Sequence, residues 1–313
     1  MGTKSTDGRL AGIKLLNQII SHKIIKKYSS SLHGEVCLAG HGLIFKVDKE
    51  NPLDHREVGR QWNKNAPAWT AMGRKGYDYY RDSFNTPAFL ELLPEVTGLT
   101  GLDIGCGEGH NTRLLVEQGA KMSAIDISDV FLNFAAEIQP ERMEIGYSNA
   151  SAVELPFPGE SFDFATGFMS FMDIPETELV LKEAFRVLKL GGFLQFSISH
   201  PCFDTPHRVK IYNPDGTTKA YEIGEYFRNL EGDLLEIDLG SRGAELGFSS
   251  IHIPRFTRTM SQWVNAIVDA GFIIERMNEP RPSDEVVEKY PHVQDSQVVA
   301  YFLHIRCRKQ CAD

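Results

Sequence analysis

Long apolar runs are absent from this 313-residue sequence, and no stretch reaches the 18 or more consecutive apolar residues that a membrane span needs. Cysteine is scarce: the five residues are odd in number and irregularly spaced, which excludes a secreted disulfide framework. Cys307 and Cys311 form a single CxxxC without a second pair, so no zinc or other metal site is predicted. We therefore expect a cytoplasmic globular protein.

Basic residues are also in deficit, with 33 Lys and Arg against 42 Asp and Glu, a net charge of −9. Residues 1–50 hold eight basic and four acidic residues, which leaves 25 basic and 38 acidic residues for the remainder. An acidic body disfavours a nucleic-acid partner, because binding to phosphates requires positive charge. Residues 1–55 are expected to form a basic N-terminal extension. In it, 9–27 is a membrane-surface or transit-like helix, a segment that packs on the body, or a disordered segment.

From residue 99 onward, short apolar runs alternate with amphipathic segments, the pattern of strand–helix–strand units with a parallel sheet. The predicted strands are residues 100–104, 122–126, 143–147, 162–168, 192–199, 272–277 and 297–305. The predicted helices are residues 110–118, 130–138, 178–188 and 261–270. Residues 56–98 are expected to form a helical cover, and residues 99–313 the main domain. Residues 200–256 break the alternation and are too long for a structureless loop, so they are expected to be a folded lid insertion.

The most informative stretch is residues 102–110, LDIGCGEGH, in which a strand leads into closely spaced glycines and then a helix. Glycines allow a sharp turn and a close approach of the backbone to a ligand. The spacing departs from the dinucleotide pattern G-x-G-x-x-G, because His110 stands at the third glycine position. Asp103, two residues before the first glycine, would repel a pyrophosphate but attract an ammonium group.

A second acid, Asp126, ends the next predicted strand, 21 residues after Gly105. A carboxylate at that place typically binds the ribose hydroxyls of an adenosine ligand, and Ile127 can lie against the adenine ring. One acid for an amine, one for a ribose and bare backbone for a carboxylate describe S-adenosylmethionine better than a dinucleotide.

With these residues, the chain resembles the class I S-adenosylmethionine-dependent methyltransferases, especially the small-molecule branch that includes quinone-biosynthesis enzymes. The resemblance covers about residues 95–307 and rests on four ordered motifs: LDIGCGEG, the acid that ends the second strand, ELPFPGESFD at 154–163 and RVLKLGG at 186–192. It implies an α/β, Rossmann-like, doubly wound sheet of seven strands in the order 3-2-1-4-5-7-6, with strand 7 antiparallel and helices on both faces.

The resemblance also implies roles for individual residues. Gly105, Cys106 and Gly107 would contact the methionine part of the cofactor, and Asp126 its ribose. The pair Asn149 and Ala150 would read the adenine edge, and Phe168 would neighbour the methyl donor. The family usually has Asp where this chain has Asn149, whose amide oxygen can still accept a hydrogen bond; the alternative is an Asn that satisfies its own backbone.

Methyl transfer by in-line displacement needs alignment and exclusion of water, and a general base only where the acceptor arrives protonated. His200, after the fifth strand, is the candidate base, with a structural histidine at the strand end as the alternative. Asp173 follows the fourth strand at the same edge. The aromatic residues of the insertion favour an apolar or aromatic small-molecule acceptor. Two other functions stay open: a nicotinamide-dependent oxidoreductase, and a non-catalytic protein that binds S-adenosylmethionine or S-adenosylhomocysteine.

Overall fold

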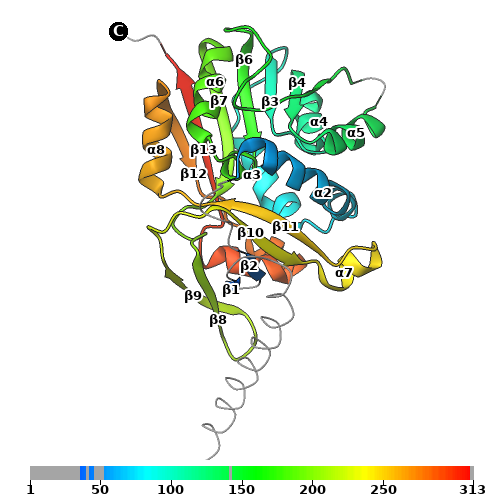
Figure 1. The fold of residues 1–313 in the computed structure, drawn as a ribbon, viewed down its shortest axis with the longest axis vertical. Helices are drawn as coiled ribbons and strands as arrows, with labels where there is room; N and C mark the ends of the chain where they lie inside the picture. Colours follow the sequence, from blue (N-terminus) through cyan, green and yellow to red (C-terminus); the bar gives the residue numbers. More distant parts are fainter. Residues whose placement is uncertain (1–35, 40–41, 46–52, 141–142, 311–313) are drawn as a thin grey trace, which may run out of the picture.

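The computed structural model describes residues 36–39, 42–45, 53–140 and 143–310, so the predicted helix at 9–27 lies outside the described residues. Its centre is a seven-stranded sheet with the order β5-β4-β3-β6-β7-β13-β12 (Figure 1). Strand β13 is antiparallel to both of its neighbours, whereas β3 to β7 run parallel. Counted along the sheet's own strands, this order is 3-2-1-4-5-7-6, so the predicted fold class is confirmed. The strands are β3 (Thr100–Ile104), β4 (Lys121–Asp126), β5 (Gly146–Asn149), β6 (Phe162–Phe168), β7 (Leu188–Ser199), β12 (Phe272–Asn278) and β13 (Phe302–Lys309).

Three strands begin more than one residue away from their predicted starts. Strand β5 begins three residues later than expected. Strand β13 begins at Phe302, because a 3-10 helix, η3 (Pro291–Gln297), and the turn that follows it precede the strand. Strand β7 begins at Leu188, so Gly191 and Gly192 lie inside the strand rather than ending a helix. The strand accommodates them with a positive φ of 78° at Gly191 and a register shift against β6.

The two faces of the sheet are covered by different helices, as the alternation of side chains along β7 shows. Leu194, Phe196 and Ile198 join one apolar cluster with residues of α6 (Thr177–Val187) and α8 (Met260–Asp269). The intervening Gln195 points to the other face, where its amide nitrogen donates to the carbonyl oxygen of Phe89 at 2.7 Å. That face carries α3 (Thr86–Leu92) and α4 (His110–Glu117), while α5 (Asp129–Glu137) follows β4.

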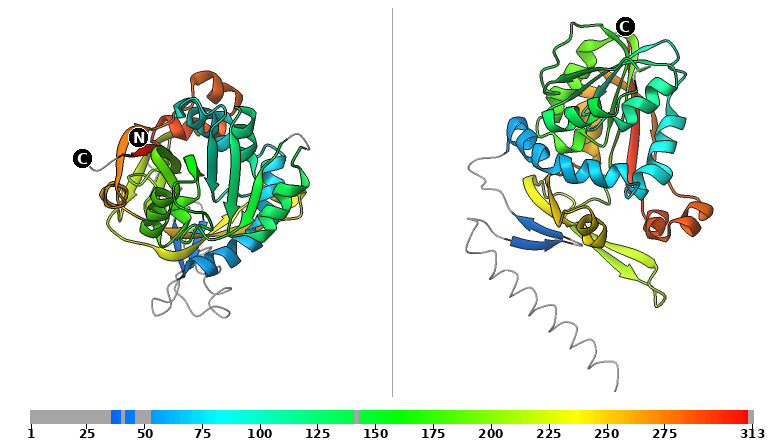
Figure 2. Two further views of the ribbon diagram at one scale, coloured as in Figure 1. Left: turned by 90° about the horizontal axis from the view of Figure 1, so that it is seen from above. Right: turned by 90° about the vertical axis from the view of Figure 1, so that its right-hand side faces the viewer.

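The insertion after the fifth strand is folded, as predicted. Strands β8 (His207–Tyr212) and β9 (Thr218–Gly224) form an antiparallel hairpin. Strands β10 (Glu231–Asp238) and β11 (Ser250–Phe256), joined through α7 (Gly240–Glu245), form a second antiparallel pair. Strand β10 also pairs with β2 (Gly42–Phe45), which pairs with β1 (Val36–Ala39), so N-terminal residues complete a four-stranded sheet below the domain (Figures 1 and 2).

Helix α2 (His55–Arg74) lies between the main sheet and the insertion (Figure 1). The buried side chain of Asn65 donates to the carbonyl oxygen of His252 on β11 at 2.7 Å and accepts from its N–H at 3.2 Å. Gln61 donates to the same oxygen at 3.0 Å. Helix α2 is followed by a short π-helix, η1 (Arg81–Asn85). These bonds fix β11 against the helix and close one side of the space above the sheet.

The β8–β9 hairpin is held to the domain through the buried carboxylate of Asp295 in η3, which follows α9 (Asp284–Lys289). Hydroxyls of Tyr301 at 2.8 Å, Tyr80 at 3.0 Å and Tyr221 at 3.1 Å donate to it. Lys210 of β8 forms an ion pair with the same carboxylate. The network therefore joins the insertion, the N-terminal cover and the last strand. Within the described part of the chain, no helix is both long and apolar enough to cross a membrane.

Candidate active site

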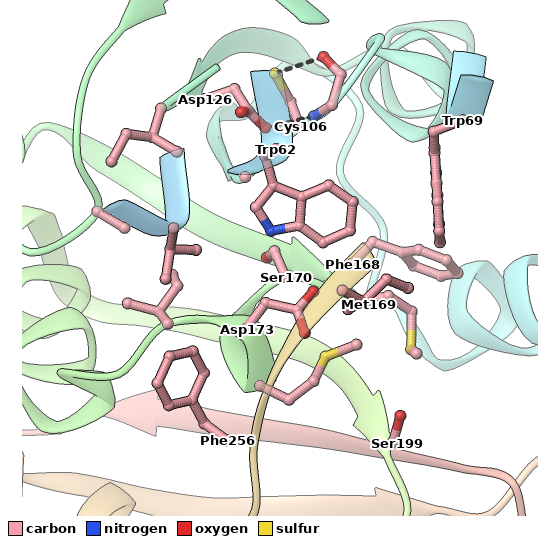
Figure 3. A pocket seen from close by; sticks show the side chains of 18 of the residues that line it. Trp62, Trp69, Cys106, Asp126, Phe168, Met169, Ser170, Asp173, Ser199 and Phe256 are labelled. Carbon is pink, nitrogen blue, oxygen red and sulfur yellow. Dashed lines mark hydrogen bonds between the residues drawn. The ribbon is translucent and has the colours of Figure 1, made fainter. Parts of the chain in front are cut away.

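A cavity of about 430 Å³ opens at the carboxyl ends of the parallel strands. Its floor comes from the loops after β3, β4, β6 and β7, one wall from α2, and an adjoining wall from β10 and β11, which is bonded to α2. Figure 3 shows Asp126 and Cys106 at one end and Phe256 and Ser199 at the other, with Trp62 between them. This position is where open α/β sheets bind ligands.

The glycine loop after β3 is shaped by three left-handed residues, Gly105, Gly107 and Gly109, with φ of 75°, 56° and 79°. The N–H groups of Gly105 and Cys106 donate to the carbonyl oxygen of Ile125 on the neighbouring strand at 2.9 and 3.0 Å. A Cβ at position 105 would lie 2.5 Å from Ser170 Cβ, whereas a Cβ at position 107 would meet nothing within 4 Å. The loop is therefore packed from below and open above Gly107, where a ligand can approach bare backbone.

Asp126 lies at the end of β4 and lines the cavity beside the glycine loop. Its two carboxylate oxygens accept from the N–H groups of Gly107 and Ser128, both at 2.8 Å. Burial raises the pKa of this carboxyl to about 6, against the opposing effect of the two backbone donors. Because both oxygens keep further lone pairs, the carboxylate is positioned to accept from a pair of ligand hydroxyls.

Most of the remaining predicted cofactor residues line the same cavity: Gly105, Cys106, Gly107, Ile127, Ala150 and Phe168. The ring of Phe168 packs edge-on against Phe89, with 5.0 Å between ring centroids. Cys106 is a free, half-buried thiol whose pKa is raised by burial, so it is a packed, un-ionised group.

Asp103 and Asn149 are not among the residues that line the cavity. The buried Asp103 carboxylate accepts from the hydroxyls of Thr112 at 2.6 Å and Thr166 at 2.9 Å, which ties β3 to α4 and β6. The amide nitrogen of Asn149 donates to the carbonyl oxygens of Asp126 and Ile127 at 3.1 and 3.0 Å. Both side chains thus support the segments that form the site.

His200 is 2% exposed and also lies behind the cavity, whereas the adjacent Ser199 and Pro201 line it. Its Nδ1 accepts from the N–H of Cys202 at 3.2 Å, and its Nε2 lies 2.7 Å from a carboxylate oxygen of Glu279. These partners place the ring proton on Nε2. The remaining lone pair is already used by the backbone, so this arrangement positions the loop after β7 and leaves no free proton acceptor.

The structure also brings residues into the cavity that the motifs did not indicate as a site. Trp62 and Trp69 of α2 stack edge to face, with ring centroids 5.5 Å apart, and both line it. Their spacing of seven residues, two helical turns, was the available signal that they share one face. Among the residues that the structure describes, no group of three or more His, Cys, Asp or Glu side chains is arranged to hold a metal ion.

At the end away from Asp126, Asp173 of the 3-10 helix η2 (Phe171–Asp173) and Arg255 of β11 line the cavity. Arg255 forms an ion pair with Asp204 at 2.9 Å. Burial raises the pKa of Asp173 to about 8, with Arg255 lowering it and Asp204 raising it. The surrounding walls are apolar and aromatic, from Phe256 and Trp263.

A sheet of this order, a glycine loop open toward the ligand and an acid at the end of the second strand define a class I S-adenosylmethionine-dependent methyltransferase domain. The open space above Gly107 and the oriented Asp126 carboxylate fit the methionine and ribose parts of that cofactor. The prediction of this class from the sequence is confirmed by comparison with known proteins, since residues 102–196 match the methyltransferase domain family.

Two relatives with assigned names are similar in sequence to part of this chain. A demethylmenaquinone methyltransferase of Lactococcus lactis is 33% identical over 147 residues, which cover 45% of this chain and 53% of that protein. A 2-methyl-6-phytyl-1,4-hydroquinone methyltransferase of Synechocystis is 34% identical over 106 residues, 34% of this chain and 33% of that protein. The chain thus spans about half the length, or less, of these relatives.

A solved structure extends the likeness over most of the fold. An S-adenosylmethionine-dependent methyltransferase from Mesorhizobium loti is 26% identical, with a TM-score of 0.59, and covers 71% of this chain and 96% of its own.

Proposed function

We propose that the protein transfers the methyl group of S-adenosylmethionine to a small aromatic acceptor of the quinol type. One observation carries the proposal: a single cavity joins the glycine loop and Asp126 to a second, aromatic-walled end that contains an isolated carboxyl group. The relatives named above as methyltransferases of demethylmenaquinone and of a phytyl-hydroquinone support an acceptor of this kind.

Bound S-adenosylmethionine would supply an electrophilic methyl group on a sulfonium. In the proposed arrangement the Asp126 carboxylate accepts from the ribose hydroxyls, and the backbone of residues 105–107 lies along the methionine part. Ile127 and Ala150 bound the adenine, Asn149 supports this segment through its bonds to the backbone of Asp126 and Ile127, and Phe168 lies next to the methionine chain. Asp103 and His200 serve by positioning the glycine loop and the loop after β7.

The chain contributes to the transfer chiefly by alignment and by exclusion of water. The walls from α2 and β11 hold the acceptor between the aromatic rings, in line with the bond that breaks. The bonds from Asn65 to β11 keep the two walls together. A small-molecule acceptor also fits the net charge of −9, and the three free cysteines of the described residues fit a cytoplasmic setting.

The test is calorimetric titration of the purified protein with S-adenosylhomocysteine, with NADH and NADPH in parallel. We expect binding of S-adenosylhomocysteine alone, and at about 100 times its Kd a stabilisation of the fold by about 2.7 kcal/mol, visible as a rise in Tm. A screen of quinols with methyl-labelled cofactor follows. Binding of a nicotinamide cofactor instead would refute the proposal, and binding without transfer to any acceptor would favour the non-catalytic alternative.

A further inference from the structure

Asp173 is placed where a methyl acceptor would lie. It ends η2, directly after β6, at the same edge of the sheet as Asp126, and it lines the cavity. Figure 3 shows its carboxyl group in the space bordered by Trp62, Ser170 and Met169. The side chain therefore meets any ligand that extends from the cofactor end toward Phe256.

The carboxyl group of Asp173 is 9% exposed and, within the described residues, has neither a hydrogen-bond partner nor an ion pair. Only its backbone N–H is bonded, to the carbonyl oxygen of Ser170 at 3.1 Å. The other four carboxylates that line the cavity all have partners. Asp126 has two backbone donors, and Asp204 has Arg255 and, at 3.6 Å, Arg208. Asp78 accepts from the N–H of Arg81 at 3.1 Å, and Glu108 forms an ion pair with Arg113 at 2.8 Å. Because buried polar groups in native proteins are paired, the missing donor is expected from the ligand.

The surroundings of Asp173 raise the pKa of its carboxyl group to about 8, so that both protonation states are accessible near neutral pH. Burial is the main cause of the raised pKa, and Arg255 acts against it while Asp204 acts with it. The elements packed against η2 carry charged and titratable groups of both signs. They include Arg255 and Arg258 from β11 and the residues after it, His200 and Asp204 after β7, and Glu176, paired with His55, at the start of α6.

We propose that Asp173 removes a proton from the acceptor, and that the acceptor therefore carries a phenolic or enolic hydroxyl. This inference rests on the proposed function. The aromatic side chains of Trp62, Phe256 and Trp263 line the cavity together with the cations Arg255 and Arg258, and this lining suits a neutral ring better than a charged amine.

The proton and electron balance is complete without another reactant. The ionised Asp173 takes the hydroxyl proton, and the resulting phenolate donates its electron pair to the methyl carbon. The bond between that carbon and sulfur breaks, and its electron pair stays on sulfur, which becomes a neutral thioether. The proton remains on Asp173 until the products leave and solvent enters.

The experiment compares the full-length protein with Asp173→Asn, which keeps the volume and polarity of the side chain but cannot accept the proton. Transfer of labelled methyl from S-adenosylmethionine is measured at pH 7.5 to 1-naphthol, which is un-ionised there, and to 4-nitro-1-naphthol, which is ionised. Asp269→Asn, on the exposed end of α8, is the matched control.

We expect Asp173→Asn to lower kcat/KM for 1-naphthol by about 100-fold or more, the usual contribution of a general base, and for 4-nitro-1-naphthol by less than about tenfold. The wild-type rate with 1-naphthol should rise between pH 6 and 9 as the carboxyl group ionises. Affinity for S-adenosylhomocysteine should be the same in both proteins.

Equal behaviour of the wild type and Asp173→Asn toward both naphthols would overturn the inference, whether both proteins transfer methyl or neither does. An equal loss with both naphthols would overturn it too, because it would indicate a structural role. Failure of the proposed function is seen separately, as a wild-type protein that does not bind S-adenosylhomocysteine.

Discussion

Replacement of Asp126 by Asn tests the cofactor end of the cavity most directly. The two carboxylate oxygens accept from different N–H groups, those of Gly107 and Ser128. An amide side chain has one acceptor oxygen, so it can keep only one of these bonds. It also changes the expected pair of ribose bonds from charged to neutral.

The magnitude follows from those ribose bonds. A hydrogen bond to a charged group contributes about 1.5–3 kcal/mol and one between neutral groups about 0.5–1.5 kcal/mol, a difference of about 1 kcal/mol for each of two hydroxyls. The sum, about 2 kcal/mol, corresponds to a roughly 30-fold rise in the Kd for S-adenosylhomocysteine, since 1.4 kcal/mol is a factor of ten. Isothermal titration calorimetry at pH 7.5 measures it, with Asp129→Asn, exposed on the first turn of α5, as the control.

The pH dependence supplies a second readout. The pKa of Asp126 in the folded protein is raised by burial to about 6, so the carboxylate that binds the ribose is lost as the pH falls through this value. The wild-type Kd should therefore rise by up to tenfold per pH unit below about 6, while that of Asp126→Asn stays flat. The effect on stability has the opposite sign: the raised pKa favours folding below the unfolded value of 3.8, and this contribution is lost as the pH rises through about 6.

An unchanged Kd at pH 7.5, or the same pH profile in both proteins, would refute the ribose assignment. A loss of binding accompanied by unfolding is separated from it by thermal melting of the ligand-free proteins at the same pH.

Four further substitutions test the architecture around this site. Gly105→Ala should lower the Tm more than Gly107→Ala, because a Cβ at 105 would lie 2.5 Å from a side-chain carbon after β6, while a Cβ at 107 meets open space. Gly107→Ala should instead weaken binding of S-adenosylhomocysteine. Thermal melts and titration calorimetry measure the two effects, and a larger loss of Tm in Gly107→Ala than in Gly105→Ala would contradict this expectation. Asn65→Ala removes both hydrogen bonds from this side chain to the backbone of His252 and leaves the bond from Gln61. It should cost about 1–3 kcal/mol, which scanning calorimetry detects as a lower Tm, and an unchanged Tm would contradict the docking of β11 on α2. His200→Ala should lower kcat while leaving the affinity for S-adenosylhomocysteine within about twofold, and a large loss of affinity in titrations would place this side chain at the cofactor instead.

The sheet and the glycine loop were predictable because their signals are local. A buried parallel strand shows itself as a short apolar run, and glycines with positive φ follow it where the chain must turn. Gly105 and Asp126 are 21 residues apart and belong to adjacent strands of one strand–helix–strand unit, so their proximity follows from the motif itself.

Other features depend on contacts between distant segments, which no local pattern contains. The Asp103 carboxylate is hydrogen-bonded to Thr166, 63 residues later in the sequence, and the His200 ring is hydrogen-bonded to Glu279, 79 residues later. These partners decide whether each side chain faces the cavity or supports it from behind. The pairing of β10 with β2 joins segments about 190 residues apart, and no local sequence pattern predicts it. Only the folded nature of the insertion could be inferred, from its length.

The cavity combines apolar walls with carboxyl groups at both ends, and the charge balance of the proposed reaction explains how these coexist. Before transfer, the sulfonium of the cofactor and an ionised Asp173 carry opposite charges, and the acceptor is neutral. A bound sulfonium would favour ionisation of Asp173, whose pKa is raised to about 8, chiefly by burial. After transfer, the thioether, the methylated acceptor and the protonated Asp173 are all neutral. A low-dielectric enclosure disfavours separated charges, so the walls formed by α2 and β11 destabilise the charged reactants relative to the neutral products. Once the products leave, solvent can take the proton from Asp173, and the carboxyl group is again without a partner until the next acceptor brings a hydroxyl.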